Sequence, residues 1–370
     1  MSARFLTVVL ERAFNMRDGF GREIDYMRIS VIDSCNLNCY YCNPCDNNEH
    51  CHALNILSVK EVLCIVRAAT RLGIKHFRLT GGEPLLHPQL DEMVLQIKKI
   101  PGVSSVSLTT NAVLLAQHAK WLKEAGIDSI NVSLDTIDAS EYERITKKPL
   151  LEEVKHGINA AIECGIRVKI NVVLTPQTDV VALTRYVAKK GTDIRFIEMM
   201  PVGEGHTNGV EPYKKVIGTL SKLYGEPCRI NTEKTKEINS ENDKRKIPDN
   251  GPAEYYIFPE LGIRVGLIQA IHGKFCDTCN RIRVTADGRL MPCLGSSVTM
   301  DLVPDSCEFT DDLEKDFVIV QALKAAIKAK PGCHNFNDNA VTYTKTTETK
   351  TTEIEAAEVN AARNMSRIGG

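Results

Sequence analysis

Six short apolar segments alternate with helical segments over residues 1–225, and this alternation constrains the fold more than any other feature. The apolar segments are rich in Val and Ile, and they lie at 27–32, 75–80, 103–110, 129–134, 168–174 and 193–198. Segments with helical periodicity follow them along the chain. Strands that lack polar alternation and are joined by helices form parallel sheets covered by helices. The pattern therefore predicts an α/β fold with a partial, TIM-like (β/α)6 barrel.

Small and polar residues stand where the predicted strands end. The segments concerned are 35–42, 81–84, 109–111, 133–135 and 199–201. In barrels and open sheets of this class, the chemistry gathers at the C-terminal ends of the strands. We therefore expect these five segments to face one mouth of the barrel.

Three cysteines in the first of these segments have the spacing of a metal-ligand or cluster-ligand set. Cys35, Cys39 and Cys42 form a C-x3-C-x2-C pattern after the first predicted strand. Three thiolates leave one coordination position open for chemistry, whereas a structural zinc site closes with four ligands. From the spacing alone, a zinc site that takes His50 or Cys51 as its fourth ligand is the alternative.

The short first apolar run indicates a reducing compartment, although the number of cysteines is high for an intracellular protein. The chain has 13 Cys in 370 residues, and its first apolar run, at 5–10, is too short for a signal peptide. In reducing compartments, clustered cysteines bind metals more often than they form disulfides. We therefore expect a cytoplasmic protein, with a mitochondrial presequence as the alternative. The net charge of -1 argues against a general binder of nucleic acid or membrane surfaces.

The character of the chain changes after residue 225. A polar segment at 229–250 is followed by two strand-like runs that predict a hairpin around Gly262, and by a helical segment at 311–328. The segment 341–353 is rich in Thr and has the composition of a linker. We expect three parts, which are the barrel at 1–225, an α+β extension at 226–340, and a linker with a C-terminal Gly-Gly tail at 341–370.

A second group of cysteines lies in the predicted extension. Cys276, Cys279 and Cys293 again offer three thiolates. A structural zinc ribbon with His272 or Cys307 as fourth ligand is the alternative for this group taken alone. Two groups of three cysteines in one chain favour two iron–sulfur clusters, each with an open iron.

Several cations lie in or beside predicted strands. Arg281 and Arg283 are two residues apart, so a strand over 281–285 places them on one face. Such a pair can bind phosphate, although an ordinary charged strand face is the alternative. Further cations in strand positions are Arg28, Arg78 and Lys169. A polyphosphate would satisfy charges in these positions, and carboxylate partners within the protein are the alternative.

The motifs resemble those of a known family. Tyr41 before the last cysteine of the first group, followed by the Gly-Gly-Glu-Pro turn at 81–84, is similar to the radical S-adenosylmethionine (SAM) superfamily. The Asn-Arg-Ile-Arg segment at 280–283 and the C-terminal Ile-Gly-Gly narrow the resemblance. Over nearly its whole length, the chain resembles the GTP 3′,8-cyclase family of molybdenum cofactor biosynthesis.

The resemblance implies roles for individual residues. Ligands of a [4Fe–4S] cluster that binds SAM would be Cys35, Cys39 and Cys42. Ligands of a second [4Fe–4S] cluster that binds the guanine of GTP would be Cys276, Cys279 and Cys293. Contacts with SAM are implied for Tyr41, Gly82, Ser133 and Met200. Contacts with GTP are implied for Arg28, Arg78, Thr109, Lys169, Arg281, Ile282 and Arg283. The residues implied in catalysis are Gly369, Gly370, Arg281 and Arg283.

The resemblance also implies the reaction. Cleavage of SAM would give a 5′-deoxyadenosyl radical that removes the ribose 3′ hydrogen of GTP. The ribose radical would add to guanine C8, and the product would be (8S)-3′,8-cyclo-7,8-dihydroguanosine 5′-triphosphate. The implied partners are a one-electron donor, a second copy in a homodimer, and the downstream cyclic pyranopterin monophosphate synthase. No nucleic acid or membrane partner is expected.

Two other functions compete with this reading, and three residues depart from the family pattern. One alternative is another twin-cluster radical SAM enzyme, such as a peptide or sulfatase maturase, and the other is a non-catalytic zinc protein. Asn43 stands where the family usually has Met, and Cys45 adds a nearby thiol. His76 replaces a Lys that is often present in the family. We expect His76 to weaken one cationic contact with the substrate.

Overall fold

A parallel sheet of six strands forms the centre of the protein. The computed structural model describes residues 16–42, 55–202, 209–230, 251–296, 299–302, 312–334 and 336. The central strands are β1 (Tyr26–Ser30), β2 (His76–Thr80), β3 (Ser105–Thr110), β4 (Ser129–Ser133), β5 (Val168–Leu174) and β6 (Asp193–Glu198). Neighbours in this series pair in parallel and in chain order. The predicted α/β fold with six strand–helix units is confirmed.

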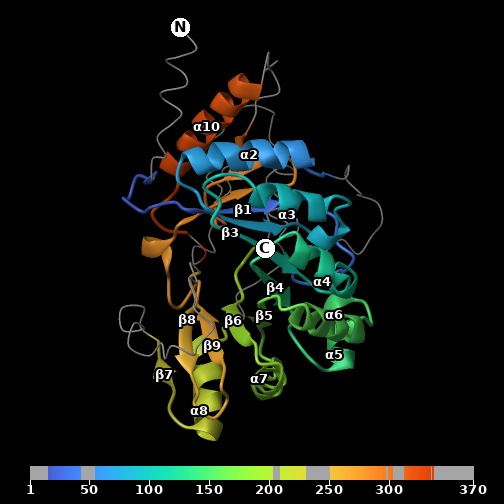
Figure 1. Ribbon diagram of the computed structural model, residues 1–370. Helices are drawn as coiled ribbons and strands as arrows, with labels where there is room; N and C mark the ends of the chain where they lie inside the picture. The colour runs from blue at the N-terminus through green and yellow to red at the C-terminus, as the bar shows by residue number, and fades with distance from the viewer. Residues whose placement is uncertain are drawn as a thin grey trace, which may run out of the picture.

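Helices cover the outer face of this sheet, as Figure 1 shows. They are α2 (Val59–Arg71), α3 (Leu90–Lys98), α4 (Leu115–Glu124), α5 (Ala139–Thr146), α6 (Leu151–Glu163) and α7 (Val180–Lys189). Helix α2 begins at a capping box, in which the Ser58 side chain accepts from the Glu61 amide and the Glu61 carboxylate accepts from the Ser58 amide. Its apolar side then packs into the main core, which includes Ile65 and Phe77.

The region after β6 extends both edges of the central sheet. Beside β6 lie β9 (Arg264–Ile268), β8 (Glu254–Ile257) and β7 (Cys228–Arg229). Beside β1 lie β10 (Arg281–Val284), β11 (Arg289–Met291) and β12 (Met300–Asp301). Strands β9 and β10 are parallel to their central neighbours, and the predicted β8–β9 hairpin is confirmed. The segment between β9 and β10 therefore passes from one edge to the other.

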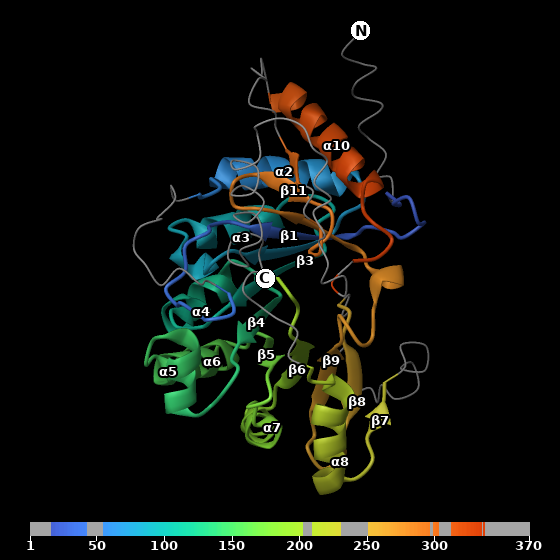
Figure 2. The same ribbon diagram turned by 180° about the vertical axis from the view of Figure 1, so that it is seen from behind.

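The remaining helical elements flank the sheet. They are η1 (Pro84–Leu86), the π-helical turn η2 (Tyr213–Ile217), α8 (Gly218–Tyr224), η3 (Cys276–Thr278) and α10 (Asp312–Lys328). Helix α10 packs beside α2, which both views show (Figures 1 and 2). The predicted helix at 311–328 is thus confirmed, and Arg229, the first residue of the polar segment at 229–250, belongs to β7. Among the described residues, no helix has the length and apolarity needed to cross a membrane.

The inner face of the sheet is polar, in contrast to the expected absence of alternation. In β1 the side chains of Met27 and Ile29 are fully buried in the core, and Arg28 between them lines a cavity. In β2 the same alternation separates buried Phe77 from Arg78. The prediction of strands without alternation is therefore wrong for β1 and β2. Successive side chains of a strand point to opposite faces, so one arginine per strand suffices to give the inner face a charge.

Candidate active site

A cavity of about 650 Å³ lies on the inner side of the sheet. Its size is in the range typical of ligand pockets. The predicted site residues that line it are Arg28, Cys35, Cys39, Tyr41, Cys42, Arg78, Gly82, Thr109, Ser133, Lys169, Met200, Cys276, Cys279, Arg281, Arg283 and Cys293. The Ile282 side chain is instead buried in the hydrophobic core, so only its main chain could contact a ligand. Gly369, Gly370, Asn43 and Cys45 lie outside the described residues.

Three arginines lie in one row across adjacent strands. The register of the sheet places Arg28 of β1 opposite Arg78 of β2 on one side and opposite Arg283 of β10 on the other. Arg281 is paired with Tyr26 in the same ladder, two residues before Arg283. Like charges directly opposite one another destabilise a sheet. An anionic ligand in the cavity would offset this repulsion.

The environment of Arg28 supports this conclusion. Burial, followed by the charges of Arg283 and Arg78, holds the pKa of Arg28 well below its ordinary value. Burial and the charge of Arg281 likewise lower the pKa of Arg283 to about 10. The Nε atoms of Arg28 and Arg281 are buried and have no hydrogen-bond partner among the described residues. Buried guanidinium groups with spare donors fit the oxygens of a polyphosphate.

The first cysteine group is held against the end of β2 by two glycines. A Cβ atom on Gly82 would lie 2.2 Å from the Ser34 carbonyl oxygen, and one on Gly81 would lie 2.4 Å from that of Ile32. The Gly82 amide donates to the Ile32 carbonyl at 2.7 Å. The Gly-Gly turn thus lets the loop that carries Cys35 pack directly on β2. The Gly82 amide is therefore hydrogen-bonded within the protein, which the sequence did not predict.

A buried carboxyl joins this turn to the next strand. Glu83 accepts from the Thr110 hydroxyl at 2.6 Å and from the Asn111 amide at 2.7 Å. The Asn111 side chain donates to Asn36 at 2.7 Å and lies 3.8 Å from the Cys35 sulfur. Burial raises the pKa of Glu83 to about 7. Burial and the nearby Glu83 carboxyl raise the pKa of Cys35 to about 11.

A second carboxyl supports the far end of the same cysteine loop. The Tyr41 hydroxyl donates to Asp135 at 2.5 Å, and the Val173 amide donates to the other oxygen of Asp135 at 2.7 Å. Burial raises the pKa of Asp135 to about 6. These contacts tie the loop between Cys39 and Cys42 to the ends of β4 and β5. The Ser-x-Asp segment at 133–135 was a sequence motif, but its contact with Tyr41 was not predicted.

The second cysteine group lies on the crossing from β9 to β10 and on the loop after β11. Cys276 and Cys279 belong to the crossing, and Cys293 follows β11. Burial opposes ionisation of Cys279, but the charges of Arg281 and Lys330 outweigh it and lower the pKa of this thiol to about 7. Thiolates beside cations are good ligands for metals. The position of the crossing brings this group to the same cavity as the first group.

All six of these cysteines are free thiols, so each is available as a cluster ligand. Among the described residues, no three His, Cys, Asp or Glu side chains converge on the position of a single metal ion. A [4Fe–4S] cluster binds its thiolates at separate irons, so its ligands need not converge in this way. His272, the alternative zinc ligand, forms a hydrogen bond with the Glu198 carboxylate through its Nδ1 atom. His50, Cys51 and Cys307 lie outside the described residues.

Two further residues line the cavity: Arg195, which was not predicted from the sequence, and His76, which was. Arg195 of β6 is 2% exposed and donates to Asn171 at 2.9 Å and to Asn131 at 2.6 Å. Its signal was a charge in an apolar strand, the same signal that identified Arg28. His76 lies 2.8 Å from the Ser105 hydroxyl, and burial lowers its pKa. A neutral imidazole supports the expectation that His76 weakens the cationic surface.

Known protein families match most of this chain in sequence. Residues 29–182 match the family model "Radical SAM superfamily", and residues 192–336 match "Molybdenum Cofactor Synthesis C". The GTP 3′,8-cyclase of Clostridium perfringens is 35% identical over 324 residues, which cover 87% of this chain and 95% of that protein. The GTP 3′,8-cyclase of Pelotomaculum thermopropionicum is 36% identical over 324 residues, with 86% and 95% coverage.

Solved structures share the fold at lower identity. Streptococcus suis SuiB bound to the precursor peptide SuiA has a TM-score of 0.52 and 14% identity, and the match covers 97% of this chain and 73% of that chain. Native anSMEcpe with bound AdoMet has a TM-score of 0.52 and 18% identity, with 82% and 84% coverage. The family is shown by the closer similarity to curated proteins: this chain belongs to the GTP 3′,8-cyclase family of the radical SAM superfamily.

Proposed function

We propose that this protein converts GTP to (8S)-3′,8-cyclo-7,8-dihydroguanosine 5′-triphosphate, the first step of molybdenum cofactor biosynthesis. It is a lyase that uses SAM and two [4Fe–4S] clusters. The observation that carries the proposal is the row of Arg28, Arg78 and Arg283 in the same cavity as both cysteine groups. The oxygens of a nucleoside triphosphate would bind these guanidinium groups and offset the repulsion between them.

The two clusters have separate places in this proposal. Cys35, Cys39 and Cys42 would hold the first cluster, and the second would be held by Cys276, Cys279 and Cys293. When bound, these groups and SAM supply the one-electron chemistry that removes the 3′ hydrogen of GTP and returns an electron and a proton after C3′ bonds to C8. The product therefore has the same atomic composition as GTP.

The protein's own contribution is to hold two nucleoside-bearing molecules in one orientation and to exclude water. We assign the triphosphate to the arginine row, with further GTP contacts from Thr109, Lys169 and the main chain at Ile282. Arg281 and Arg283 lie between the triphosphate and the second cysteine group in this assignment, which is why we also place them in catalysis. The SAM contacts are assigned to Tyr41, Gly82, Ser133 and Met200.

Other parts of the proposal concern the chain outside the cavity and its partners. Gly369 and Gly370 would form a catalytic tail, because two small residues can enter a cavity already occupied by ligands. We further propose a cytoplasmic homodimer that receives electrons from a one-electron donor. The product would pass to cyclic pyranopterin monophosphate synthase.

An anaerobic turnover experiment tests the proposed reaction. Protein reconstituted with iron and sulfide is incubated with SAM, a reductant and GTP, and the products are separated by liquid chromatography and mass spectrometry. We expect a new compound with the mass of GTP, and 5′-deoxyadenosine that increases with it. If GTP stays unchanged while 5′-deoxyadenosine forms equally without it, the substrate assignment is wrong. ATP in place of GTP is the matched control, because it carries the same triphosphate.

A further inference from the structure

A buried lysine lies behind the second cysteine group. Lys330 is 3% exposed, and its Nζ donates to the carbonyl oxygen of Arg281 at 2.8 Å and to that of Pro292 at 2.9 Å. The positive charge of Lys330 also lowers the pKa of the Cys279 thiol. Pro292 directly precedes Cys293. One ammonium group therefore bridges the main chain beside two of the three cysteines, close to the Cys279 thiol.

The charge balance around Lys330 is unusual for a lysine in a protein interior. An ammonium has three donors, and Lys330 directs two of them to neutral carbonyl oxygens. Within the described part of the chain, no carboxylate forms an ion pair with Lys330. A buried charge is costly unless an opposite charge is close. The thiolate of Cys279, or a cluster that it binds, is the negative charge that this site provides.

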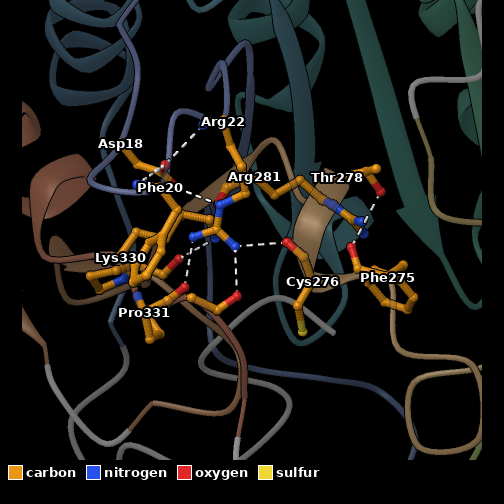
Figure 3. A network of polar contacts seen from close by, with 11 residues as sticks. Asp18, Phe20, Arg22, Phe275, Cys276, Thr278, Arg281, Lys330 and Pro331 are labelled. Atoms are coloured by element: carbon orange, nitrogen blue, oxygen red, sulfur yellow. Dashed lines mark hydrogen bonds and ion pairs between the residues drawn. The ribbon is translucent and has the colours of Figure 1, made fainter.

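An arginine from the start of the described chain fixes the backbone that follows Lys330. Arg22 donates to the carbonyl oxygens of Pro331 at 2.6 Å and of Gly332 at 3.0 Å. It also donates to the carbonyl oxygen of Cys276 at 2.7 Å. Figure 3 shows the guanidinium between Pro331 and Cys276, with the Cys276 sulfur directed away from it. Arg22 therefore connects a cysteine of the second group to the segment that carries Lys330.

The orientation of Arg22 is itself determined by its neighbours. Its Nε donates to Asp18 at 2.6 Å, and the other carboxylate oxygen of Asp18 accepts the backbone amides of Phe20 and Arg22. The Phe20 ring lies 5.3 Å from the Arg22 guanidinium carbon. A Cβ on Gly332 would lie 2.9 Å from the same ring, so the segment after Lys330 approaches it closely. Such a turn, with its hydrogen bonds satisfied, has little freedom to move.

We propose that Lys330 is a positioning residue of the second cluster, and that Arg22 holds Lys330 in place. Lys330 orders the backbone at Arg281 and Pro292 and places a positive charge beside a cluster thiolate. Hydrogen bonds to cluster sulfurs and nearby positive charge raise the reduction potential of iron–sulfur clusters. The inference rests on the proposed function, because it takes Cys276, Cys279 and Cys293 as cluster ligands.

The test measures the second cluster alone. In the full chain, Cys35, Cys39 and Cys42 are replaced by Ala, and the protein is reconstituted anaerobically. Lys330→Met is compared with Lys328→Met, which alters an exposed lysine two residues away. The measurements are iron and sulfide per chain, and the midpoint potential from a redox titration followed by electron paramagnetic resonance.

We expect Lys328→Met to match its parent, and Lys330→Met to shift the midpoint potential to more negative values or to lose the cluster. Equal potential and equal iron content in the two variants would overturn the role of Lys330. Absence of iron from the parent itself would instead contradict the second cluster of the proposed function. Cleavage of SAM by Lys330→Met with its first cysteine group intact shows that the variant folds.

The role of Arg22 is tested in the same background. Arg22→Gln should release iron to a chelator about tenfold faster than its parent, the scale of one charge-assisted hydrogen bond. Arg17→Gln is the control, because Arg17 is exposed on the same N-terminal segment. Rescue of the slow release by Arg22→Lys would show that one donor suffices. Equal release rates for Arg22→Gln and Arg17→Gln would refute the link between Arg22 and Lys330.

Discussion

Replacement of Arg28 by Met should have opposite effects on substrate binding and on the stability of the ligand-free protein. Arg28 lies at the centre of the arginine row, and its Nε has no hydrogen-bond partner in the part of the chain that the structure describes. Met keeps most of the side-chain length and removes the charge. The row would then present two arginines, Arg78 and Arg283, separated by an apolar residue.

The size of both effects follows from the register of the strands. At a separation of about 7 Å and an effective dielectric constant of about 20, two unit charges repel by about 2 kcal/mol. Arg28 has two such neighbours. Because solvent in the cavity screens part of this repulsion, we expect the unfolding free energy of the ligand-free protein to rise by about 1–2 kcal/mol. Loss of one buried phosphate contact should weaken GTP binding by about 3 kcal/mol, or roughly 150-fold.

Two measurements on the reconstituted protein check this prediction. Anaerobic calorimetry gives the dissociation constant for GTP, and thermal unfolding without GTP gives the stability. Arg185→Met is the control, because Arg185 is exposed on α7. The reasoning is refuted if Arg28→Met binds GTP as tightly as its parent, or if it melts at a lower temperature than the control.

Three further predictions concern the support of the first cysteine group. Burial raises the pKa of Glu83 from 4.5 to about 7, so between these pH values the folded iron-free protein keeps a proton that the unfolded chain releases. The contribution of this carboxyl to the unfolding free energy is therefore fully present below pH 4.5, and it falls by about 3 kcal/mol as the pH rises through 7. Urea unfolding across this range should show that Glu83→Gln lacks the decline. Gly82→Ala should lower the unfolding free energy by more than about 3 kcal/mol, because the new Cβ would overlap the Ser34 carbonyl. The purified variant should also contain little iron at the first cysteine group. Tyr41→Phe leaves buried Asp135 without its hydroxyl donor and should lower the unfolding free energy by about 1–3 kcal/mol; an unchanged melting curve would contradict this.

The local part of the fold was predictable because its signals are local. The six central strands lie within a few residues of the predicted positions, and helices follow them as predicted, since each strand is an apolar run and each helix has its own periodicity. The capping box of Ser58 and Glu61 at the start of α2 is likewise a local feature of the sequence. The same reasoning applied to β1 missed the polarity of its inner face, because a single arginine is a weak signal of alternation.

The long-range part of the fold was not predictable from one sequence. The pairing of β10 with β1 joins residues that are about 250 positions apart, and no local pattern records such a partner. For this reason the extension was expected as a separate region, whereas its strands continue both edges of the central sheet. The proposed division of the chain at residue 225 stays a prediction.

The site was predictable where chemistry breaks a pattern. Cysteine spacing and charges inside apolar strands identified residues that do line one cavity. Glu83, Arg22 and Lys330 act through contacts with main-chain atoms or with other side chains, and these contacts exist only once the chain has folded. The roles of Gly369 and Gly370 stay predictions, since these residues lie outside the described part of the chain.

One isotope experiment tests the central claim, which is that the 5′-deoxyadenosyl radical takes its hydrogen atom from ribose C3′ of GTP. Reconstituted protein is supplied with SAM, a reductant and GTP that carries deuterium at ribose C3′, and the 5′-deoxyadenosine is analysed by mass spectrometry. The account predicts one deuterium in each 5′-deoxyadenosine formed during turnover, and none when the deuterium is placed at C2′. Unlabelled 5′-deoxyadenosine alongside converted 3′-deuterated GTP would contradict it.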